Sequence, residues 1–305
     1  MPKAYVFTRY GGPEAEALVE QDRPSPGAGQ VLVAVRAAGV NPVDWKQRTG
    51  YRRPGAAARE LPAVFGNEVA GVVEETGPDV TGFAVGDEVF GNPVTGGYAD
   101  YALLPTTVTA HKPAALSFTD AATLPVAAAT AYDAIHQLGL PSGATVLITG
   151  AGGGVGVAAA QIAHVLGLRV VGVASDGKKD FVESLGAVHV PSGPGLAERV
   201  AAASDGVDGV LDLVGGEVLE AAATLLADRT KLITGADRET VARLGGAGVE
   251  RARTAAVLDE VARLVVDGRL RPFVTGTFPL DRAAEALRTV EDGHARGKIV
   301  IEVAR

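Results

Sequence analysis

The sequence contains no cysteine, and this absence removes several classes of chemistry at once. Disulfide bonds, thiol nucleophiles, thiolate-ligated zinc and iron–sulfur clusters all require cysteine sulfur. Histidine is scarce as well, with five residues that are scattered along the chain without the short spacing of metal ligands. The chain therefore offers little to a protein whose chemistry depends on thiolates or on a histidine-rich metal centre.

An excess of basic residues is also missing, because 28 lysines and arginines stand against 36 aspartates and glutamates, for a formal charge of −8. Nucleic acids and anionic membranes are bound through basic surfaces. No apolar run approaches the roughly 20 residues that cross a bilayer. Arg9 interrupts the N-terminus before a signal-like apolar region develops. We expect a soluble, cytoplasmic protein without a nucleic-acid partner and without membrane insertion.

The composition that is present is that of a globular protein, with 47% hydrophobic and 21% charged residues. At about 150 residues per domain, 305 residues suggest two domains. The first third has short β-branched runs at residues 30–36 and 69–74, punctuated by turn pairs such as Gly77-Pro78 and Gly96-Gly97. This spacing predicts an irregular antiparallel barrel.

From about residue 118 the pattern changes, and strand candidates alternate with helical ones. The strands are predicted at 145–149, 169–173, 209–213 and 231–234. Between the first two, Ala158, Ile162, Val165 and Leu166 recur at helical spacing and predict one apolar helix face. Such alternation indicates a parallel sheet covered by helices. After about residue 268 the chain returns to short strands, as at 298–303, and we expect it to rejoin the first domain.

The strongest single signal is a glycine-rich turn between the strand at 145–149 and the following helix. Without Cβ atoms, backbone N–H groups can approach a pyrophosphate, and the helix N-terminus contributes roughly half a positive charge. Ala151, Gly153 and Gly156 have the spacing of a dinucleotide-binding loop, with one residue between the first two and two residues between the last two. In such a loop the last glycine lets helix and strand pack closely. The alternative is a glycine-rich turn without a ligand. The residues assigned to the loop are Ala151, Gly152, Gly153, Gly154, Val155 and Gly156.

The choice of nucleotide depends on the end of the second strand, where an acidic residue would accept a hydrogen bond from the ribose 2′-hydroxyl of NAD. Here the strand runs into Ala174-Ser175, without a carboxylate at its tip. Ser175 can hydrogen-bond a 2′-phosphate, and Lys178 and Lys179 can supply charge-assisted contacts. Two adjacent lysines are also common on a solvated face, and Asp176 either points to solvent or weakens the preference. We predict NADPH rather than NADH.

At this point the chain resembles the medium-chain dehydrogenase/reductase superfamily, and specifically its zinc-free quinone oxidoreductase branch, related to ζ-crystallin. The resemblance covers nearly the whole chain. It implies an α/β fold in which a GroES-like β-barrel catalytic domain (1–117 and 269–305) and a Rossmann domain with a doubly wound parallel sheet (118–268) enclose the active-site cleft. It also implies a homodimer. The stretches that carry it are residues 38–44, 48–50, 66–71, 85–90 and 97–99, the glycine loop, and residues 297–300.

The resemblance also assigns residues around the hydride acceptor. Zinc-dependent alcohol dehydrogenases of the superfamily have a cysteine where this chain has Asn41 and a histidine where it has Asn67. We expect no metal and assign Asn41 as a neutral hydrogen-bond donor near the nicotinamide ribose or the substrate carbonyl. The alternative is an asparagine that opens an Asn-Pro turn. Tyr51 is the candidate proton donor, although it lies one position earlier than the family pattern, and a packing or gating tyrosine is the alternative.

The resemblance places further residues at the cofactor. Thr130 is expected to face the nicotinamide or its phosphate, or else to bond its own helix backbone. Gly215 follows the strand at 209–213, and Gly235 and Ala236 follow the strand at 231–234, where ligands of open α/β sheets bind. Plain turns are the alternative for all three.

These observations lead to an NADPH-dependent oxidoreductase that transfers hydride to a quinone or a similar activated alkene without zinc. Such acceptors disperse the developing negative charge over their own atoms, so that the protein mainly positions the two rings and excludes water. The alternatives are an enoyl-thioester or 2-alkenal reductase and, in another class, an NADPH-binding protein without catalysis.

Overall fold

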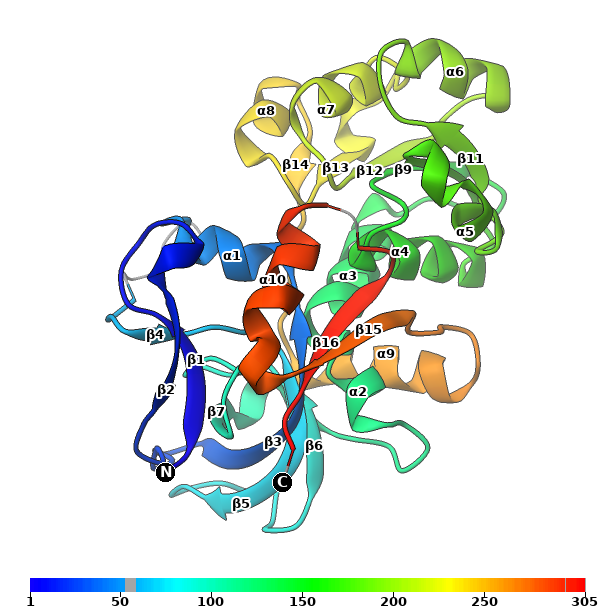
Figure 1. Ribbon diagram of the computed structural model, residues 1–305. Coiled ribbons are helices and arrows are strands. Elements are labelled where there is room, and N and C mark those ends of the chain that lie inside the picture. The colour runs from blue at the N-terminus through cyan, green and yellow to red at the C-terminus, as the bar shows by residue number, and fades with distance from the viewer. Residues whose placement is uncertain (53–58, 294, 305) are drawn as a thin grey trace. The chain divides into compact units, whose positions relative to one another are not determined.

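The computed structural model describes residues 1–52, 59–293 and 295–304. Its contacts divide the chain into two compact units (Figure 1). Unit 1 comprises Met1–Val126, Arg253–Val266 and Val274–Arg305, and unit 2 comprises Ala127–Ala252 and Asp267–Phe273. This division differs from the boundaries expected at residues 118 and 268, because the helices α2 (Phe118–Ala121) and α9 (Ala255–Val266) belong to unit 1.

Unit 1 contains a seven-stranded sheet and a three-stranded sheet. The smaller sheet has the order β2 (Glu16–Glu20), β1 (Lys3–Phe7), β4 (Ala63–Val64). The larger sheet has the order β15 (Val274–Pro279), β16 (Lys298–Glu302), β3 (Gln30–Val40), β5 (Val69–Thr76), β6 (Glu88–Gly91), β8 (Thr109–His111), with β7 (Tyr101–Pro105) paired to β3.

The expectation of an antiparallel barrel needs correction, because the strands of the described residues form open sheets, and β15 pairs with β16 in parallel. The reason lies in β3. Its first half pairs with β7 and its second half with β16, while β5 lies along its other edge. The register between β3 and β5 shifts at two points, and such irregularities bend a strand. Two different strands therefore share one edge of β3.

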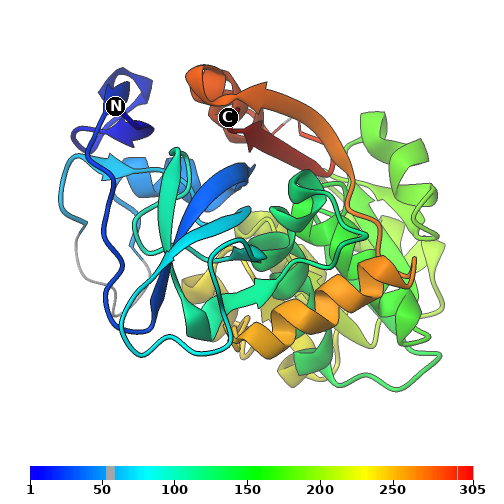
Figure 2. The same cartoon turned by 90° about the horizontal axis from the view of Figure 1, so that it is seen from below.

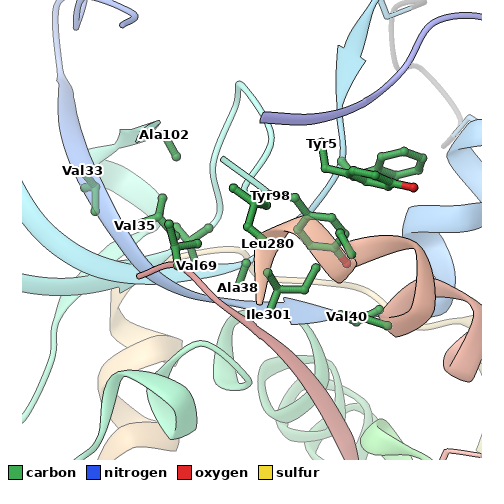
Figure 3. Packing of buried hydrophobic residues seen from close by; sticks show 14 of the residues in the cluster. Tyr5, Val33, Val35, Ala38, Val40, Val69, Tyr98, Ala102, Leu280 and Ile301 are labelled. Atoms are coloured by element: carbon green, nitrogen blue, oxygen red, sulfur yellow. The ribbon is translucent and has the colours of Figure 1, made fainter. Parts of the chain in front are cut away.

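The core of unit 1 lies between these strands and the helix α10 (Ala283–Glu291). Figure 3 shows Val33, Val35 and Ala38 along β3, with Val69, Ile301 and Tyr98 around them. The rings of Phe65 and Tyr98 stack with their centroids 6.1 Å apart. The helix α9, the orange helix of Figure 2, contacts β8. The packing of Tyr98 against Phe65 and the rest of this core fixes the position of its hydroxyl, which belongs to the candidate site.

Unit 2 is a six-stranded sheet in which every pair of neighbours is parallel. Counted from β9, the chain proceeds outward on one side to the third strand and then returns to the other side, so the strand order is that of a Rossmann fold. The expected α/β fold class is confirmed. The order is β11 (Val188–Pro191), β10 (Arg169–Ala174), β9 (Thr145–Thr149), β12 (Gly209–Asp212), β13 (Leu232–Thr234), β14 (Ala247–Gly248).

Helices connect these strands. The helix α4 differs from the predicted single apolar face, because it ends at Val165 and Leu166 beyond it is 36% exposed. Ala158 and Ile162 are buried as expected, but Val157 and Ala160 on other sides are buried too, since α4 contacts α3 as well as β9 and β10. The helices of unit 2 are α3 (Ala129–Leu138), α4 (Gly154–Val165), α5 (Lys179–Glu183), α6 (Leu196–Ala203), α7 (Gly216–Ala223) and α8 (Arg238–Arg243).

Across the described part of the chain, every helix is too short or too polar to span a lipid bilayer.

Candidate functional site

The glycine-rich turn lies at the carboxyl end of β9, beside the point where the strand order reverses. Gly150 has φ +68°, a left-handed conformation that suits glycine. The N–H of Ala151 donates to the Val173 carbonyl at 3.0 Å, and that of Gly153 donates to the Gly150 carbonyl at 3.0 Å. These two amides therefore hold the turn in shape, and their hydrogens point at the protein itself.

The first turn of α4 presents a different set of amides. The opening N–H groups of a helix lack intrahelical acceptors, so those of Gly154 and Val155 are available to an anion at the positive end of the helix. A Cβ at Gly156 would lie 2.4 Å from the Gly150 oxygen, which confirms the predicted close packing at this glycine. The turn thus has the shape and the donors that a dinucleotide diphosphate requires.

A lysine lies beside this turn. A Cβ at Gly152 would come within 2.7 Å of Lys178 Cδ, so the aliphatic part of Lys178 passes directly over the loop. Lys179 instead lies 4.0 Å from Glu183 on an exposed surface. Ser175 is exposed at the end of β10, immediately before the short 3₁₀ helix Asp176–Lys178. Of the two lysines, the geometry favours Lys178 as a cofactor ligand.

His189 was not assigned by the sequence reasoning, yet it lies at the same end of the sheet. It faces Gly172 of β10 in the parallel register, and its Nε2 is 3.2 Å from the Ala174 carbonyl oxygen. The signal that could have found it is the pairing of β10 with β11, which brings the third strand beside Ser175.

Asp212, fully buried at the end of β12, connects three strand ends. Its carboxylate accepts hydrogen bonds from Thr149 Oγ1 of β9 at 2.7 Å and from Thr234 Oγ1 of β13 at 2.6 Å. It also accepts from the backbone N–H of Gly215 at 3.1 Å. The loops at the switch point of the sheet are therefore shaped by one carboxylate.

The predicted cofactor residues Gly215, Gly235 and Ala236 lie on these loops. Gly215 has φ +86°, and the N–H groups of Gly235 and Ala236 bond to the Asp212 carbonyl and to Thr234 Oγ1. All three are thus placed at the carboxyl ends of β12 and β13, as expected from the strand pattern.

Thr130 lies in α3 and is joined to Arg251 through its hydroxyl group. Its hydroxyl oxygen accepts a hydrogen bond of 2.6 Å from Arg251 Nη1. Arg251 also donates from Nε to buried Asp133 at 3.0 Å. The expected place of Thr130 at the nicotinamide stays a prediction.

In unit 1, Asn41 is the N-cap residue of α1 (Pro42–Arg48), and its carboxamide bonds two side chains from outside this helix. Nδ2 donates to Glu68 Oε1 at 2.7 Å, and Oδ1 accepts from Lys298 Nζ at 2.7 Å. Lys298 also lies 2.8 Å from Glu68 Oε1. Sequence reasoning had assigned Asn41 but no role to its two partners.

Asp44, in the same helix, joins Asn41 to Asn67. It accepts from the backbone N–H of Asn41 at 2.8 Å, from the Tyr98 hydroxyl at 2.8 Å, and from Asn67 Nδ2. Burial raises the pKa of Asp44 to about 6, and the charge of Glu68 adds to this effect. Burial also raises the pKa of Tyr98 well above its ordinary value, so the phenol remains a proton donor to Asp44.

Asn41 and Asn67, which stand where zinc-dependent relatives are expected to have zinc ligands, are thus connected through the Asp44 carboxylate. Within residues 1–52, 59–293 and 295–304, no three His, Cys, Asp or Glu side chains gather in a metal-binding arrangement.

Tyr51 follows α1 and has an exposed fraction of 46%. Its N–H donates to the Lys46 carbonyl at 2.9 Å, a bond that caps the end of α1 after Gly50 at φ +93°. The Asn41 side-chain bonds go to Glu68 and Lys298, and the role of Tyr51 as proton donor stays a prediction.

Comparison with known proteins gives a consistent result. The alcohol dehydrogenase GroES-like domain family matches residues 27–114, and the zinc-binding dehydrogenase family matches residues 185–301. The mitochondrial NAD(P)H oxidoreductase RTN4IP1 of Homo sapiens is 33% identical over 326 residues, which cover 90% of this chain and 82% of that protein. The chloroplastic quinone-oxidoreductase QR1 of Triphysaria versicolor is 32% identical, with 98% of both chains covered.

Among solved structures, the quinone oxidoreductase from Coxiella burnetii superposes with a TM-score of 0.89 at 30% identity, over 99% of both chains. The similarity therefore extends over both units of the chain.

Proposed function

Because this chain belongs to the zinc-free quinone oxidoreductase branch of the medium-chain dehydrogenase/reductase superfamily, we propose that it is an NADPH-dependent reductase of quinones or similar activated alkenes. The observation that carries the proposal is the glycine turn that joins β9 to α4, with two first-turn amides open to a diphosphate and Lys178 lying over the loop. The relatives with quinone reductase names support the choice of acceptor.

The cofactor is held by residues of unit 2. The N–H groups of Gly154 and Val155 hold the diphosphate, and Ser175 and Lys178 hold the 2′-phosphate. Thr130 faces the nicotinamide or its phosphate, while Gly215, Gly235 and Ala236 allow the close approach of the ribose. When bound, the reduced nicotinamide supplies a hydride.

The acceptor is held by unit 1. Asn41 donates a hydrogen bond to its carbonyl oxygen, and this bond strengthens as negative charge develops there. A quinone or an α,β-unsaturated carbonyl spreads this charge over several atoms, so a neutral donor suffices. Tyr51 supplies the proton that completes the reduction.

The test mixes purified protein with NADPH and follows the loss of reduced-cofactor absorbance. One panel contains benzoquinones and naphthoquinones, a second contains enones and 2-alkenals, and a third contains crotonyl thioesters. We expect turnover with the first two panels. Tight NADPH binding without turnover in any panel would favour the non-catalytic alternative, and a preference for thioesters would make the chain an enoyl reductase.

Two further points belong to the proposal. The edge strand β14 has only two residues, and a homodimer formed along this edge stays a prediction. A cytoplasmic location also stays a prediction, since the two relatives above are named as mitochondrial and chloroplastic proteins.

A further inference from the structure

Three buried polar side chains from distant parts of unit 1 meet in one cluster, and the proposed function uses only one of them. Asn41 is 4% exposed, Glu68 is 0% exposed and Lys298 is 5% exposed. Asn41 caps α1, Glu68 precedes β5, and Lys298 begins β16. Glu68 and Lys298 are 230 positions apart in the chain. The presence of Glu68 and Lys298 beside Asn41, the predicted hydrogen-bond donor to the substrate, needs a reason.

Stability alone is a weak reason. A buried ion pair often contributes no more than well-packed apolar residues of the same volume, because both charges lose their hydration. The surrounding chain also makes room for this pair. A Cβ at Gly39 would lie 2.1 Å from Glu68 Oε1, so β3 can pass the carboxylate only with a glycine at this position. The sequence therefore accommodates the pair at a cost in apolar packing.

The donors and acceptors of the cluster define one orientation of the Asn41 carboxamide. A lysine ammonium only donates, and an ionised carboxylate only accepts. Asn41 Oδ1 faces Lys298 at 2.7 Å, and Nδ2 faces Glu68 at 2.7 Å. Rotating the amide by half a turn would set its NH₂ group against the ammonium and its oxygen against the carboxylate. Both contacts would be repulsive, so the orientation is locked.

The cluster also satisfies its own charges. Lys298 Nζ donates to Asn41 Oδ1, to Glu68 Oε1 at 2.8 Å and to the Val40 carbonyl at 3.0 Å, which accounts for its three hydrogens. Glu68 Oε2 accepts from the Val126 N–H at 2.7 Å. Asn41 Nδ2 carries two hydrogens, of which one is directed to Glu68. The second is the group that this arrangement can offer to a ligand.

We propose that Lys298 and Glu68 are positioning residues that fix the Asn41 carboxamide so that its second Nδ2 hydrogen faces the oxygen of the hydride acceptor. This inference rests on the proposed reductase function. As the acceptor carbon gains a hydride from the reduced nicotinamide, the displaced π electrons move to the acceptor oxygen, which Asn41 stabilises by its N–H. That oxygen then takes a proton from Tyr51 or water. The ammonium on Oδ1 polarises the amide and makes Nδ2 a stronger donor.

The decisive variant removes both charges together. Lys298→Met alone would leave a buried, unpaired carboxylate and threatens folding. In the double variant Lys298→Met/Glu68→Gln, the glutamine needs its oxygen for the Val126 N–H, so its NH₂ group faces Asn41 and favours the flipped amide. We expect a folded protein whose kcat for quinone falls about 10- to 100-fold. This is less than the roughly 100- to 1000-fold lost when such a donor is removed, because the carboxamide is reoriented and not deleted. The KM for NADPH should stay within twofold.

The control is Lys112, a second buried lysine of unit 1, whose glutamate partner Glu88 has a 46% exposed side chain. Lys112 lies 2.9 Å from Glu88 and is not in contact with Asn41. The double variant Lys112→Met/Glu88→Gln should keep the wild-type kcat. The single variant Lys298→Arg retains a cation that only donates hydrogen bonds. Its kcat should lie between those of the wild type and of Lys298→Met/Glu68→Gln.

A readout that does not depend on turnover completes the test. With ¹⁵N-labelled asparagine, the Asn41 side-chain amide is identified by its loss in Asn41→Asp, and its two hydrogens should have widely different chemical shifts in the wild type. The double variant at Lys298 and Glu68 should reduce this difference. Unchanged kcat and unchanged amide shifts in an active protein would overturn the inference. Absence of turnover in the wild type would instead overturn the proposed function, and the inference with it.

Discussion

At the scale of single residues, the two neighbouring lysines after β10 have different surroundings. The Lys178 chain lies against Gly152 of the glycine turn, whereas Lys179 lies near Glu183 in solvent. An ionised lysine that bonds a phosphate contributes about 1.5 to 3 kcal/mol, while an exposed pair contributes little. Only Lys178 is therefore expected to distinguish the two nicotinamide cofactors.

We predict that Lys178→Ala raises the KM for NADPH about tenfold, the effect of about 1.4 kcal/mol, and leaves the KM for NADH nearly unchanged. Lys179→Ala is the matched control and should alter either KM by less than twofold. Steady-state kinetics with both cofactors at saturating quinone measures this. Equal effects of the two substitutions would show that the assignment of Lys178 is wrong.

At the scale of elements, the short helix α1 carries Asn41 at its start and is held at both ends. Near its start, Asp44 accepts from Tyr98. At its end, Arg48 donates to Glu16 of β2, to Glu291 of α10 and to the Gly11 carbonyl. The Arg48 and Glu16 side chains are 2% and 4% exposed. The position of Asn41, the proposed hydrogen-bond donor to the substrate, thus depends on the buried Arg48–Glu16 ion pair at the other end of α1.

We predict that Arg48→Met lowers the free energy of unfolding by about 3 to 5 kcal/mol, because the buried Glu16 carboxylate loses its cationic partner, although it keeps the hydrogen bond from the Tyr5 hydroxyl. Arg263→Met is the control, since Arg263 is 61% exposed and pairs with Glu260 within α9. It should change stability by less than about 1 kcal/mol. The chain has one tryptophan, and it is Trp45 of α1, so urea denaturation followed by its fluorescence reports on this helix. A small effect at Arg48 would contradict the anchoring role.

At the scale of the whole molecule, a buried carboxyl with a raised pKa makes stability depend on pH. Burial raises the pKa of Asp44 from 3.8 to about 6. Between these values the folded protein binds a proton more tightly than the unfolded chain, so the free energy of unfolding falls as pH rises through this window. The shift of about two pKa units corresponds to a loss of about 3 kcal/mol.

We predict that Asp44→Asn removes this fall. Its free energy of unfolding relative to the wild type should increase by up to about 3 kcal/mol between pH 4 and pH 7, whatever constant loss the new amide introduces. Asp22→Asn, at an exposed position, should follow the wild-type curve. Urea titrations at a series of pH values measure the difference, and parallel curves for wild type and Asp44→Asn would refute the prediction.

The sequence by itself determined the features that depend on neighbours in the chain. The strands at 145–149 and 169–174 and the glycine turn between the first strand and α4 were predicted nearly to the residue, because turn chemistry and hydrophobic periodicity are local. The acidic and cysteine-free composition likewise limited the classes of function without any structure. Lys178 was already among the candidates for this reason, whereas Asn41 was assigned from the family resemblance.

The tertiary structure alone decided which distant groups meet. Glu68 and Lys298 stood in recognisable stretches of sequence, but nothing local indicates that β16 returns beside β3 and brings an ammonium to the Asn41 carboxamide. Asp212 became the connection of three strand ends only when β9, β12 and β13 aligned, and the branching at β3 replaced the expected barrel with open sheets. Sequence periodicity records which face of an element is buried, whereas the partners of a buried charge follow from how elements far apart in the chain pack together.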